Sequence, residues 1–282
     1  MRLDCAVLGG GPAGLSAAFY LARTGLRTTV VEAGVLGGRC AALGLVSNHP
    51  AFPEGIIGRE LAGRYAAQAR AHGASFLAAR ARSVEERGGG LLVSLDGGAL
   101  LARSVIVATG SEFLPLGLPE EERFRGRGLE HAPLDAAHLW RGRSVAVVGG
   151  GEAAAHQALR LAEAGATVRL WVRGADFRAV APLRRALSCN RRVAVRTGVS
   201  VRELLGGERL GAVVLEEGGR RRREEVDALF VLVGQRPRLP GLPERAPGLF
   251  IAGDAAGLPR QTSVAAGSGI QQAMAAAAFL SS

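Results

Sequence analysis

The chain carries the same short glycine turn twice, and this repeat constrains its fold more than any other feature. Residues 7–14 read VLGGGPAG and residues 147–154 read VVGGGEAA. Each turn follows a short apolar run, at 3–8 and 144–148, and precedes an alanine-rich stretch typical of a helix. A strand, a glycine turn and a helix in this order begin a Rossmann βαβ unit. The sequence therefore predicts an α/β protein with two Rossmann-like, three-layer dinucleotide-binding domains.

The first turn has the full G-x-G-x-x-G pattern, formed by Gly9, Gly11 and Gly14. The first glycine permits a tight turn, the second lets a pyrophosphate approach the backbone, and the third permits close packing of helix on strand. Backbone N–H groups at the helix start favour an anion. The next predicted strand contains Glu32, 18 residues beyond Gly14, where a carboxylate is expected to bind ribose hydroxyls. The first turn therefore predicts a dinucleotide such as FAD.

The second turn repeats the pattern with Gly149, Gly151 and Ala154. Its second strand, TVRLWV, ends without an acid and is followed by Arg173 and Arg178. Arginine suits a 2′-phosphate, so the second nucleotide is expected to be NADPH, with NADH as the alternative. A protein that holds both FAD and NADPH is suited to hydride transfer from nicotinamide to flavin.

Two further strand-like runs, 104–110 and 249–254, are assigned to the FAD domain. The second run ends at Asp254, which either binds the ribitol or pyrophosphate region of FAD or caps the following turn. Proline-rich segments, which are typical of linkers, lie at 114–121 and 235–248.

The FAD domain is therefore expected to be discontinuous. We assign residues 1–112 and 241–282 to FAD binding and residues 113–240 to NAD(P)H binding.

The charge of the chain raises the question of a nucleic-acid partner. All 35 basic residues are arginines, and the formal net charge is +10. A basic surface attracts phosphate backbones. The densest run, Arg220 to Arg223, is flanked by glutamates, however, and aromatic residues make up only 5% of the chain. We therefore predict a solvated hairpin turn at the arginine run and no nucleic-acid partner.

The chain start and the cysteines bear on location. The opening residues MRLDCAVLGGG lack the pattern of a secretory signal, and no apolar run is long enough for a membrane span. Cys5, Cys40 and Cys189 are odd in number and widely spaced, which fits neither a disulfide framework nor a zinc site. We expect a cytoplasmic protein without membrane contact.

Several longer motifs resemble the low-molecular-weight thioredoxin reductases over nearly the whole chain. They are GGGPAGLSAAFY, GGRCAALGLVSNHPAFPEGIIGREL, VIVATGSEFLPL, FRGRGL, VAVVGGGEAA, VRGADFRA and GLFIAGDAAGLPRQTSVAAGSGIQQA. The resemblance implies FAD, NADPH and a homodimer. Carried over by position, it implies FAD contacts at Gly9, Gly11, Pro12, Ala13, Gly14, Glu32, Gly38, Arg39, Asn48, Thr109, Gly110, Gly253, Asp254 and Gln261. It implies NADPH contacts at Gly149, Gly151, Glu152, Ala153, Ala154, Arg173 and Arg178.

The chain departs from the family pattern at the redox dithiol. In the family, G-R-G-x-x-x is followed by C-x-x-C-D, but here Ala132 and Asp135 stand at the two cysteine positions and Ala136 replaces the acid. Reduction of thioredoxin by the family mechanism is therefore not expected. The family's H-R-R-x-x-x-R motif is also incomplete, because Gly174 replaces the middle arginine.

Three residues are candidates for the missing chemistry. Cys40 follows GGR, and it is either a redox thiol activated by Arg39 or a packed small residue. His131, just before the lost pair, is either a proton donor or an ordinary histidine. Arg39 itself replaces a glutamine and would place a cation near the flavin.

The function predicted from these features is an FAD-dependent NAD(P)H oxidoreductase that lacks the dithiol. Its electron acceptor is left open between O2, a quinone, an electron carrier and a partner protein. Two alternatives stand beside it: a disulfide reductase that uses Cys40, and a non-catalytic flavin-binding redox sensor or interaction protein.

Overall fold

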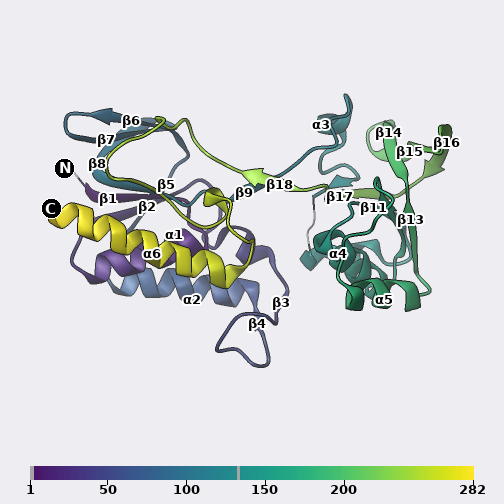
Figure 1. The fold of residues 1–282 in the computed structure, drawn as a ribbon, viewed down its shortest axis with the longest axis horizontal. Coiled ribbons are helices and arrows are strands. Elements are labelled where there is room, and N and C mark those ends of the chain that lie inside the picture. The colour runs from purple at the N-terminus through teal and green to yellow at the C-terminus, as the bar shows by residue number, and fades with distance from the viewer. Residues whose placement is uncertain (1–2, 132–133) are drawn as a thin grey trace. The chain divides into compact units, whose positions relative to one another are not determined.

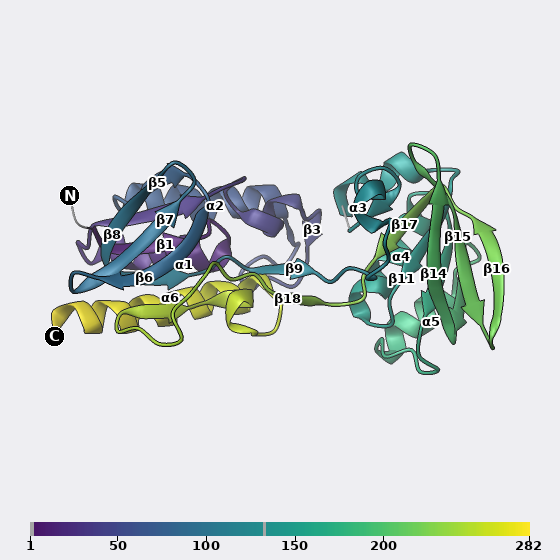
Figure 2. The same ribbon diagram turned by 90° about the horizontal axis from the view of Figure 1, so that it is seen from above.

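The computed structural model describes residues 3–131 and 134–282 (Figures 1 and 2). The chain divides into two compact units: Met1–Glu112 with Arg236–Ser282, and Phe113–Gln235. The sequence analysis placed the end of the second unit at residue 240, a few residues after Gln235. Two short strands connect the units and pair in a two-stranded sheet: β9 (Ser111–Phe113) and β18 (Gln235–Pro237).

The first unit is built on a seven-stranded sheet in the order β5-β2-β1-β8-β7-β6, with β19 also paired to β8. Its strands are β1 (Leu3–Leu8), β2 (Thr28–Glu32), β5 (Ser75–Ala78), β6 (Ala81–Arg87), β7 (Gly90–Leu95), β8 (Gly98–Val107) and β19 (Leu249–Ile251). β1, β2, β5, β8 and β19 are parallel, whereas β6 and β7 form an antiparallel hairpin on β8. A small hairpin of β3 (Leu45–Val46) and β4 (Ile56–Ile57) stands apart.

Three helices, α1 (Pro12–Arg23), α2 (Gly58–Ala71) and α6 (Thr262–Ser281), lie on one side of the parallel strands, and the β6–β7 hairpin packs on the other side of these strands (Figure 1). Successive side chains of β1 alternate between these two sides. Cys5 and Val7 belong to the cluster that includes α1 and α6, whereas Ala6 and Leu8 pack with residues of β6 and β7. The alternation produces three layers with a core on each face of the sheet.

The second unit repeats this plan. Its parallel sheet has the order β10-β17-β11-β12-β13, and an antiparallel sheet of β14, β15 and β16 accompanies it. The bounds are β10 (Leu129–Glu130), β11 (Ser144–Val148), β12 (Thr167–Val172), β13 (Val193–Thr197), β14 (Val199–Gly206), β15 (Leu210–Glu217), β16 (Arg220–Glu225) and β17 (Ala228–Val231). The helices are α3 (Glu121–Phe124), α4 (Glu152–Glu163) and α5 (Ala181–Cys189), and a 3-10 helix, η2, spans Leu134–Trp140.

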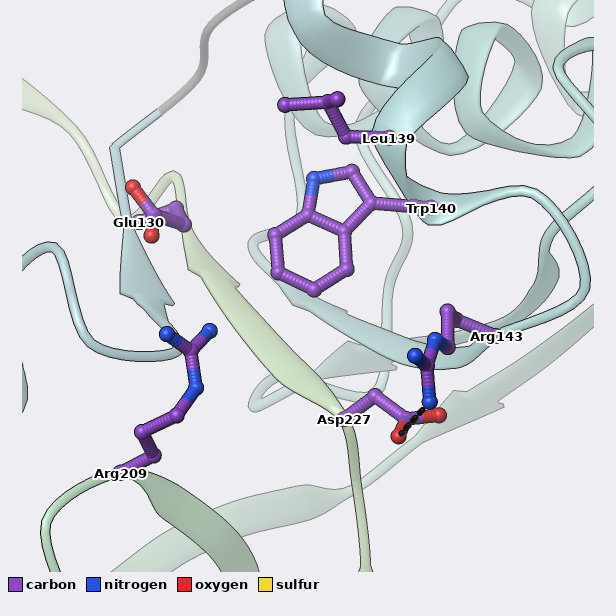
Figure 3. A pocket seen from close by; sticks show the side chains of 6 residues that line it. All are labelled: Glu130, Leu139, Trp140, Arg143, Arg209 and Asp227. Atoms are coloured by element: carbon purple, nitrogen blue, oxygen red, sulfur yellow. Dashed lines mark ion pairs between the residues drawn. The ribbon is translucent and has the colours of Figure 1, made fainter.

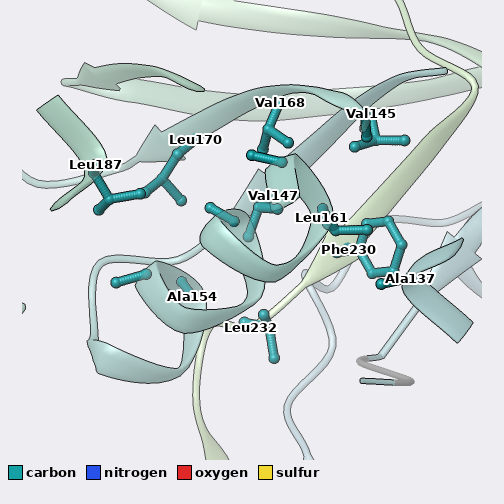
Figure 4. Close-up of a cluster of buried hydrophobic side chains, with 14 of the residues drawn as sticks. Ala137, Val145, Val147, Ala154, Leu161, Val168, Leu170, Leu187, Phe230 and Leu232 are labelled. Carbon is teal, nitrogen blue, oxygen red and sulfur yellow. The ribbon is translucent and has the colours of Figure 1, made fainter. Parts of the chain in front are cut away.

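The same alternation divides the core of the second unit. Val145 and Val147 of β11 pack against α4, where they meet Leu161 (Figure 4). Ala146 and Val148 point to the other face, toward the cluster formed with the antiparallel sheet. The predicted α/β class with two Rossmann-like, three-layer units is therefore confirmed.

The arginine run adopts a different structure from the predicted hairpin turn. Arg220 to Arg223 form the first part of strand β16, and the two-residue turn before them is Gly218–Gly219. Both glycines have positive φ, as a tight hairpin of two residues requires. Glutamates neutralise the run as expected: Arg221 pairs with Glu203 at 3.4 Å. The prediction was wrong about the turn because two adjacent glycines fix it before the arginines begin.

The described helices are too short or too polar for a bilayer. None of them combines enough length and apolar character to cross a membrane.

Candidate dinucleotide-binding sites

The first glycine turn is fixed by backbone hydrogen bonds on several sides. Gly9 N–H donates to the Val31 carbonyl at 2.8 Å, and Gly37 N–H donates to the Gly10 carbonyl at 2.6 Å. Gly9 has a φ of +109°, and a Cβ at this position would lie 2.3 Å from the Ala108 carbonyl oxygen. Only glycine fits here, because both the backbone angle and the neighbouring strand exclude a side chain.

The other two glycines of this turn have opposite surroundings. A Cβ at Gly14 would lie 1.9 Å from the Gly9 carbonyl oxygen, so this glycine lets α1 approach the turn. A Cβ at Gly11 would meet no atom within 4 Å. Gly11 is the N-cap of α1, where backbone N–H groups and the helix dipole favour an anion. Open space at a helix start is the cradle that a pyrophosphate needs, so the residues present fit a dinucleotide.

Glu32, at the end of β2, holds a fixed position beside this turn. Its Oε2 accepts a hydrogen bond from Gly10 N–H at 2.6 Å, and its Oε1 accepts one from Gly34 N–H at 2.7 Å. Each carboxylate oxygen can accept a second bond. The side chain is therefore oriented by the backbone and keeps acceptor capacity for ribose hydroxyls.

Most of the remaining predicted FAD contacts lie at the carboxyl ends of the parallel strands. β1, β2, β8 and β19 are parallel, and the predicted contacts after these strands include Gly9, Thr109, Gly110 and Gly253. Ligands of open parallel sheets bind outside the carboxyl ends of the strands. Pro12 and Ala13 begin α1, and Gly38 and Arg39 begin the 3-10 helix η1 (Gly38–Ala42).

Two side-chain contacts tie the surrounding loops together. Asn48 Nδ2 donates to Gln261 Oε1 at 2.7 Å, which links the loop between β3 and β4 to the N-cap of α6. Gly253 N–H donates to Ser268 Oγ at 3.0 Å. Ser268 was not found from the sequence, since no motif marks a serine inside a helix as a partner of a distant turn.

Asp254 contacts polar side chains from two other segments of the first unit. It lies in the 3-10 helix η3 (Gly253–Ala256), and its side chain is 11% exposed. Arg39 Nη2 forms an ion pair with its Oδ2, and Ser111 Oγ lies 3.2 Å from the same oxygen. Burial lowers the pKa of Arg39 and is the largest influence on it, ahead of the opposing attraction to Asp254. Sequence reasoning placed Arg39 and Asp254 in the site but found neither their pairing nor Ser111.

The second turn repeats the geometry of the first. Gly149 has a φ of +154°, and a Cβ there would lie 2.4 Å from the Leu232 carbonyl oxygen. A Cβ at Gly151, the N-cap of α4, would meet no atom within 4 Å. Glu152 and Ala153 are exposed in the first turn of α4, and Ala154 is fully buried. The open cradle is therefore present in this unit too.

The two arginines expected to bind a 2′-phosphate lie beside this cradle. Arg173 directly follows β12, and Arg178 N–H donates to the Gly150 carbonyl at 2.9 Å, inside the glycine turn. Both residues are exposed. Within the described part of the chain, neither guanidinium takes part in a salt bridge. They are therefore available to an anionic ligand.

Cys40 is placed among apolar side chains. It is 4% exposed and packs with Val46, Ile56 and Leu61. Its Sγ donates to the Gly58 carbonyl at 3.7 Å, and burial raises the pKa of the thiol. A nucleophilic cysteine needs a lowered pKa and access, so these surroundings disfavour a redox thiol. Arg39, expected to activate it, is paired with Asp254 instead.

His131 lies in the second unit at the carboxyl end of β17. Its Nδ1 is 3.1 Å from the Val231 carbonyl, and its ring stacks on Phe113 with centroids 5.6 Å apart. A carbonyl only accepts, so Nδ1 donates and Nε2 of the neutral ring carries a lone pair. Nε2 is buried and has no partner among the described residues. Ala132, the first of the two lost cysteine positions, lies outside the described residues.

A cavity of about 450 Å³ also opens in the second unit, away from the glycine turn (Figure 3). Arg143 and Asp227, which pair at 3.6 Å, directly precede β11 and β17 and so lie at the amino ends of these strands. Glu130 and Arg209 complete the charged lining, around Trp140. The charges of the two arginines and two carboxylates that line the cavity balance, so the cavity does not favour binding of a phosphate group.

Comparisons with known proteins point to one family. The family model described as pyridine nucleotide-disulphide oxidoreductase matches residues 3–247. The chain is 30% identical over 297 residues to thioredoxin reductase of Treponema pallidum, covering 98% of this chain and 97% of that protein. The crystal structure of Lactococcus lactis thioredoxin reductase matches with a TM-score of 0.92 and 25% identity over 99% of each chain. That of T. acidophilum thioredoxin reductase matches with a TM-score of 0.88 and 26% identity over 100% of this chain and 99% of that one.

Proposed function

This chain belongs to the pyridine nucleotide-disulphide oxidoreductase family, whose members are FAD-dependent oxidoreductases, and we propose that it is a member that works without a redox dithiol. In this proposal it oxidises NADPH and delivers the electrons to an acceptor other than a disulfide of its own. One observation carries the proposal: both glycine turns keep an open cradle, at Gly11 and at Gly151, while the cysteine pair is replaced by Ala132 and Asp135.

The proposed chemistry belongs to the cofactor, and the chain supplies its binding. Bound FAD would accept a hydride equivalent from reduced nicotinamide and pass two electrons to the acceptor. The N-terminus of α1 would hold the pyrophosphate, and Glu32 would receive ribose hydroxyls. In the second unit, the N-terminus of α4 would hold the other pyrophosphate.

NADPH is proposed as the donor because of Arg173 and Arg178. Their exposed guanidiniums have no acid partner in the described chain, and the Arg178 backbone is hydrogen-bonded to the turn itself. A 2′-phosphate would supply the missing negative charge. NADH lacks this group, so it is proposed as the weaker donor.

The thiols of this chain offer little support for a disulfide reductase. Cys40 and Cys5 are buried, and burial raises the pKa of both thiols, that of Cys5 to about 12. Cys189 is exposed but lies at the end of α5, in the second unit. We therefore place direct electron transfer from flavin to O2, a quinone, an electron carrier or a partner protein ahead of the Cys40 mechanism.

His131 is proposed as the proton donor of the second unit, supported by its buried Nε2 with no partner in the described chain. Replacing His131 with phenylalanine should then change the pH profile of acceptor reduction. The same pH profile in His131→Phe would remove this residue from the mechanism.

A homodimer is also proposed. Leu45 and Ile57 pair across the β3–β4 hairpin and are 55% and 50% exposed, which favours a protein contact over solvent. Analytical ultracentrifugation of the FAD-loaded protein tests it, and a monomer at micromolar concentration would oppose it.

The function is tested by anaerobic stopped-flow absorbance of the FAD-loaded protein mixed with NADPH and, separately, with NADH. We expect the oxidised flavin band to bleach within seconds with NADPH and more slowly with NADH. Oxidised thioredoxin should not accelerate NADPH consumption. If neither nucleotide bleaches a flavin that dithionite still reduces, the protein is a flavin-binding sensor instead of a reductase.

A matched variant separates nucleotide binding from folding. Gly151 has a φ of −110° and open space around it, so Gly151→Val should fold normally and obstruct only the second cradle. We expect unchanged FAD content and thermal stability, with bleaching by NADPH slowed by about 10-fold or more. Unchanged bleaching would show that nucleotide does not bind at this turn.

A further inference from the structure

Three segments of the first unit meet at Asp254. Arg39 comes from η1, Ser111 from β9 and Asp254 from η3, and Arg39 and Asp254 are separated by 215 residues of sequence. The three polar groups form a closed triangle, since Arg39 Nη2 also donates to Ser111 Oγ at 2.8 Å. The triangle therefore joins the parts of a discontinuous unit.

The two oxygens of Asp254 have different roles in this triangle. Oδ2 accepts from both Arg39 and Ser111. Oδ1 accepts no hydrogen bond from any residue in the described chain. One oxygen is thus anchored, and the other keeps its acceptor capacity.

Charge gives the triangle a second consequence. The Asp254 side chain is only 11% exposed, and its negative charge is paired with the guanidinium of Arg39. A dinucleotide pyrophosphate is itself an anion, and a second negative charge at the same edge of the sheet would oppose it. The guanidinium of Arg39 cancels the charge of Asp254 and leaves its acceptor oxygen in place.

The carboxylate of Glu32 is held in a different way from that of Asp254. Both oxygens of Glu32 are held by backbone N–H groups, of Gly10 and Gly34, which form with the turn. Asp254 has no such backbone donor among the described residues and relies on side chains. Its orientation can therefore be lost by a single substitution elsewhere in the chain.

We propose that Arg39 is a positioning residue for FAD, which orders Asp254 through Oδ2 before the cofactor binds and leaves Oδ1 to receive a hydroxyl of the cofactor. The inference rests on the proposed function, because it requires FAD in the first unit. It adds a determinant of cofactor affinity that lies outside the glycine turn.

The experiment measures FAD affinity of the apoprotein by quenching of flavin fluorescence, so no turnover is needed. Arg39→Gln should weaken FAD binding by about 10-fold or more, because one charged hydrogen-bond partner of a largely buried carboxylate is lost. Arg39→Lys keeps the positive charge and should recover part of the affinity. Arg64→Gln is the matched control, since Arg64 also pairs with a carboxylate, Glu60, but on the exposed face of α2. Its affinity should stay within about twofold of the wild type.

A double-mutant cycle tests whether Arg39 acts through Asp254. Arg39→Gln added to Asp254→Asn should weaken FAD binding no further than Asp254→Asn alone, because the oxygen to be positioned is already altered. Independent, multiplying effects of the two substitutions, or an unchanged affinity in Arg39→Gln, would overturn the proposal while the proposed function stands. A wild-type apoprotein that binds no FAD would overturn both. Thermal melts of the apoproteins show whether Arg39→Gln has lost affinity through unfolding, in which case the folded variants Arg39→Lys and Ser111→Ala replace it in the test.

Discussion

In the proposed function, one residue at the end of the second strand of each unit selects the kind of nucleotide that the turn binds. Glu32 ends β2 in the first unit, whereas Arg173 follows β12 in the second. A carboxylate accepts from ribose hydroxyls and repels a phosphate, and a guanidinium does the reverse. The two turns share their backbone geometry, so the proposed specificity rests on this difference in charge.

The two arginines of the second unit should therefore determine the preference for NADPH. Arg173→Ala combined with Arg178→Ala is expected to raise KM for NADPH by about 10- to 100-fold, since each lost charge-assisted hydrogen bond weakens binding substantially. KM for NADH should change little. Steady-state kinetics with an artificial acceptor measures both.

Arg191→Ala is the control for this pair. Arg191 is exposed, but it precedes β13 and so lies at the amino ends of the parallel strands. Its KM for NADPH should match the wild type. An equal loss in Arg191→Ala would mean that general positive charge, and not a 2′-phosphate site, attracts NADPH.

The three thiols should differ sharply in reactivity. Burial raises the pKa of Cys5 to about 12 and raises that of Cys40, so the neutral form of each is favoured in the folded protein. We expect an alkylating reagent at about pH 8 to modify Cys189 quickly and the other two only after unfolding in denaturant. Mass spectrometry of timed samples measures this. Rapid labelling of Cys40 in the folded protein would support the alternative function, a disulfide reductase that uses Cys40.

Residues in local patterns were predictable, and residues joined across the chain were not. The roles of Gly9, Gly11 and Gly14 follow from spacing alone, because the strand, turn and helix that use them are contiguous. The triangle of Arg39, Ser111 and Asp254 depends on how β8, β19 and their loops come together, which no short motif encodes.

At the level of elements, the first unit depends on how closely α1 and α6 approach each other. A Cβ at Gly269, in α6, would lie 2.0 Å from the carbonyl oxygen of Ala13, in α1. Both helices lie on the same face of the sheet (Figures 1 and 2). A backbone oxygen cannot move without the helix, so only glycine permits this contact.

Replacing two glycines of α6 with alanine should therefore have opposite effects on the stability of the protein. Gly269→Ala should destabilise the protein by about 1–3 kcal/mol, because the added methyl group overpacks a rigid contact. Gly267→Ala, in the same helix with no atom within 4 Å of the added Cβ, should stabilise it by about 0.5–1 kcal/mol through helix propensity. Urea unfolding monitored by circular dichroism compares the two. Equal effects would show that α1 and α6 are not in tight contact.

The sequence predicted elements beside the glycine turns better than elements far from them. The strands and helices of the two Rossmann motifs were identified from their apolar runs and turns. The arginine run was assigned to a turn although it forms β16, because its solvent-facing charges hide the strand pattern. The pairing of β16 with β15 decides its structure, and pairing is a long-range property.

For the whole molecule, the main feature is that the second unit is inserted into the first. Glu112 and Arg236 lie on either side of the insertion. Arg236 Nε donates a hydrogen bond to Glu112 Oε1 at 2.6 Å. Each unit has hydrophobic clusters of its own. Domains inserted at such adjacent points commonly fold independently.

Removing the insertion should therefore leave the first unit intact. We expect a protein in which a short glycine-serine linker replaces Phe113–Gln235 to bind FAD within about threefold of the full-length affinity. It should show no bleaching with NADPH. Fluorescence titration and stopped-flow absorbance measure the two properties, and loss of FAD binding in a folded protein would assign part of the FAD site to the second unit.

The insertion also sets the order in which the protein can be completed on the ribosome. All of the second unit is synthesised before β19 and α6, which belong to residues 236–282 and are needed to complete the first unit. At ~5–20 residues per second, these last elements follow a few seconds later. Asp254 and Gln261 are among the last predicted FAD contacts to be synthesised, so the predicted FAD site can be completed only after the whole second unit has been made.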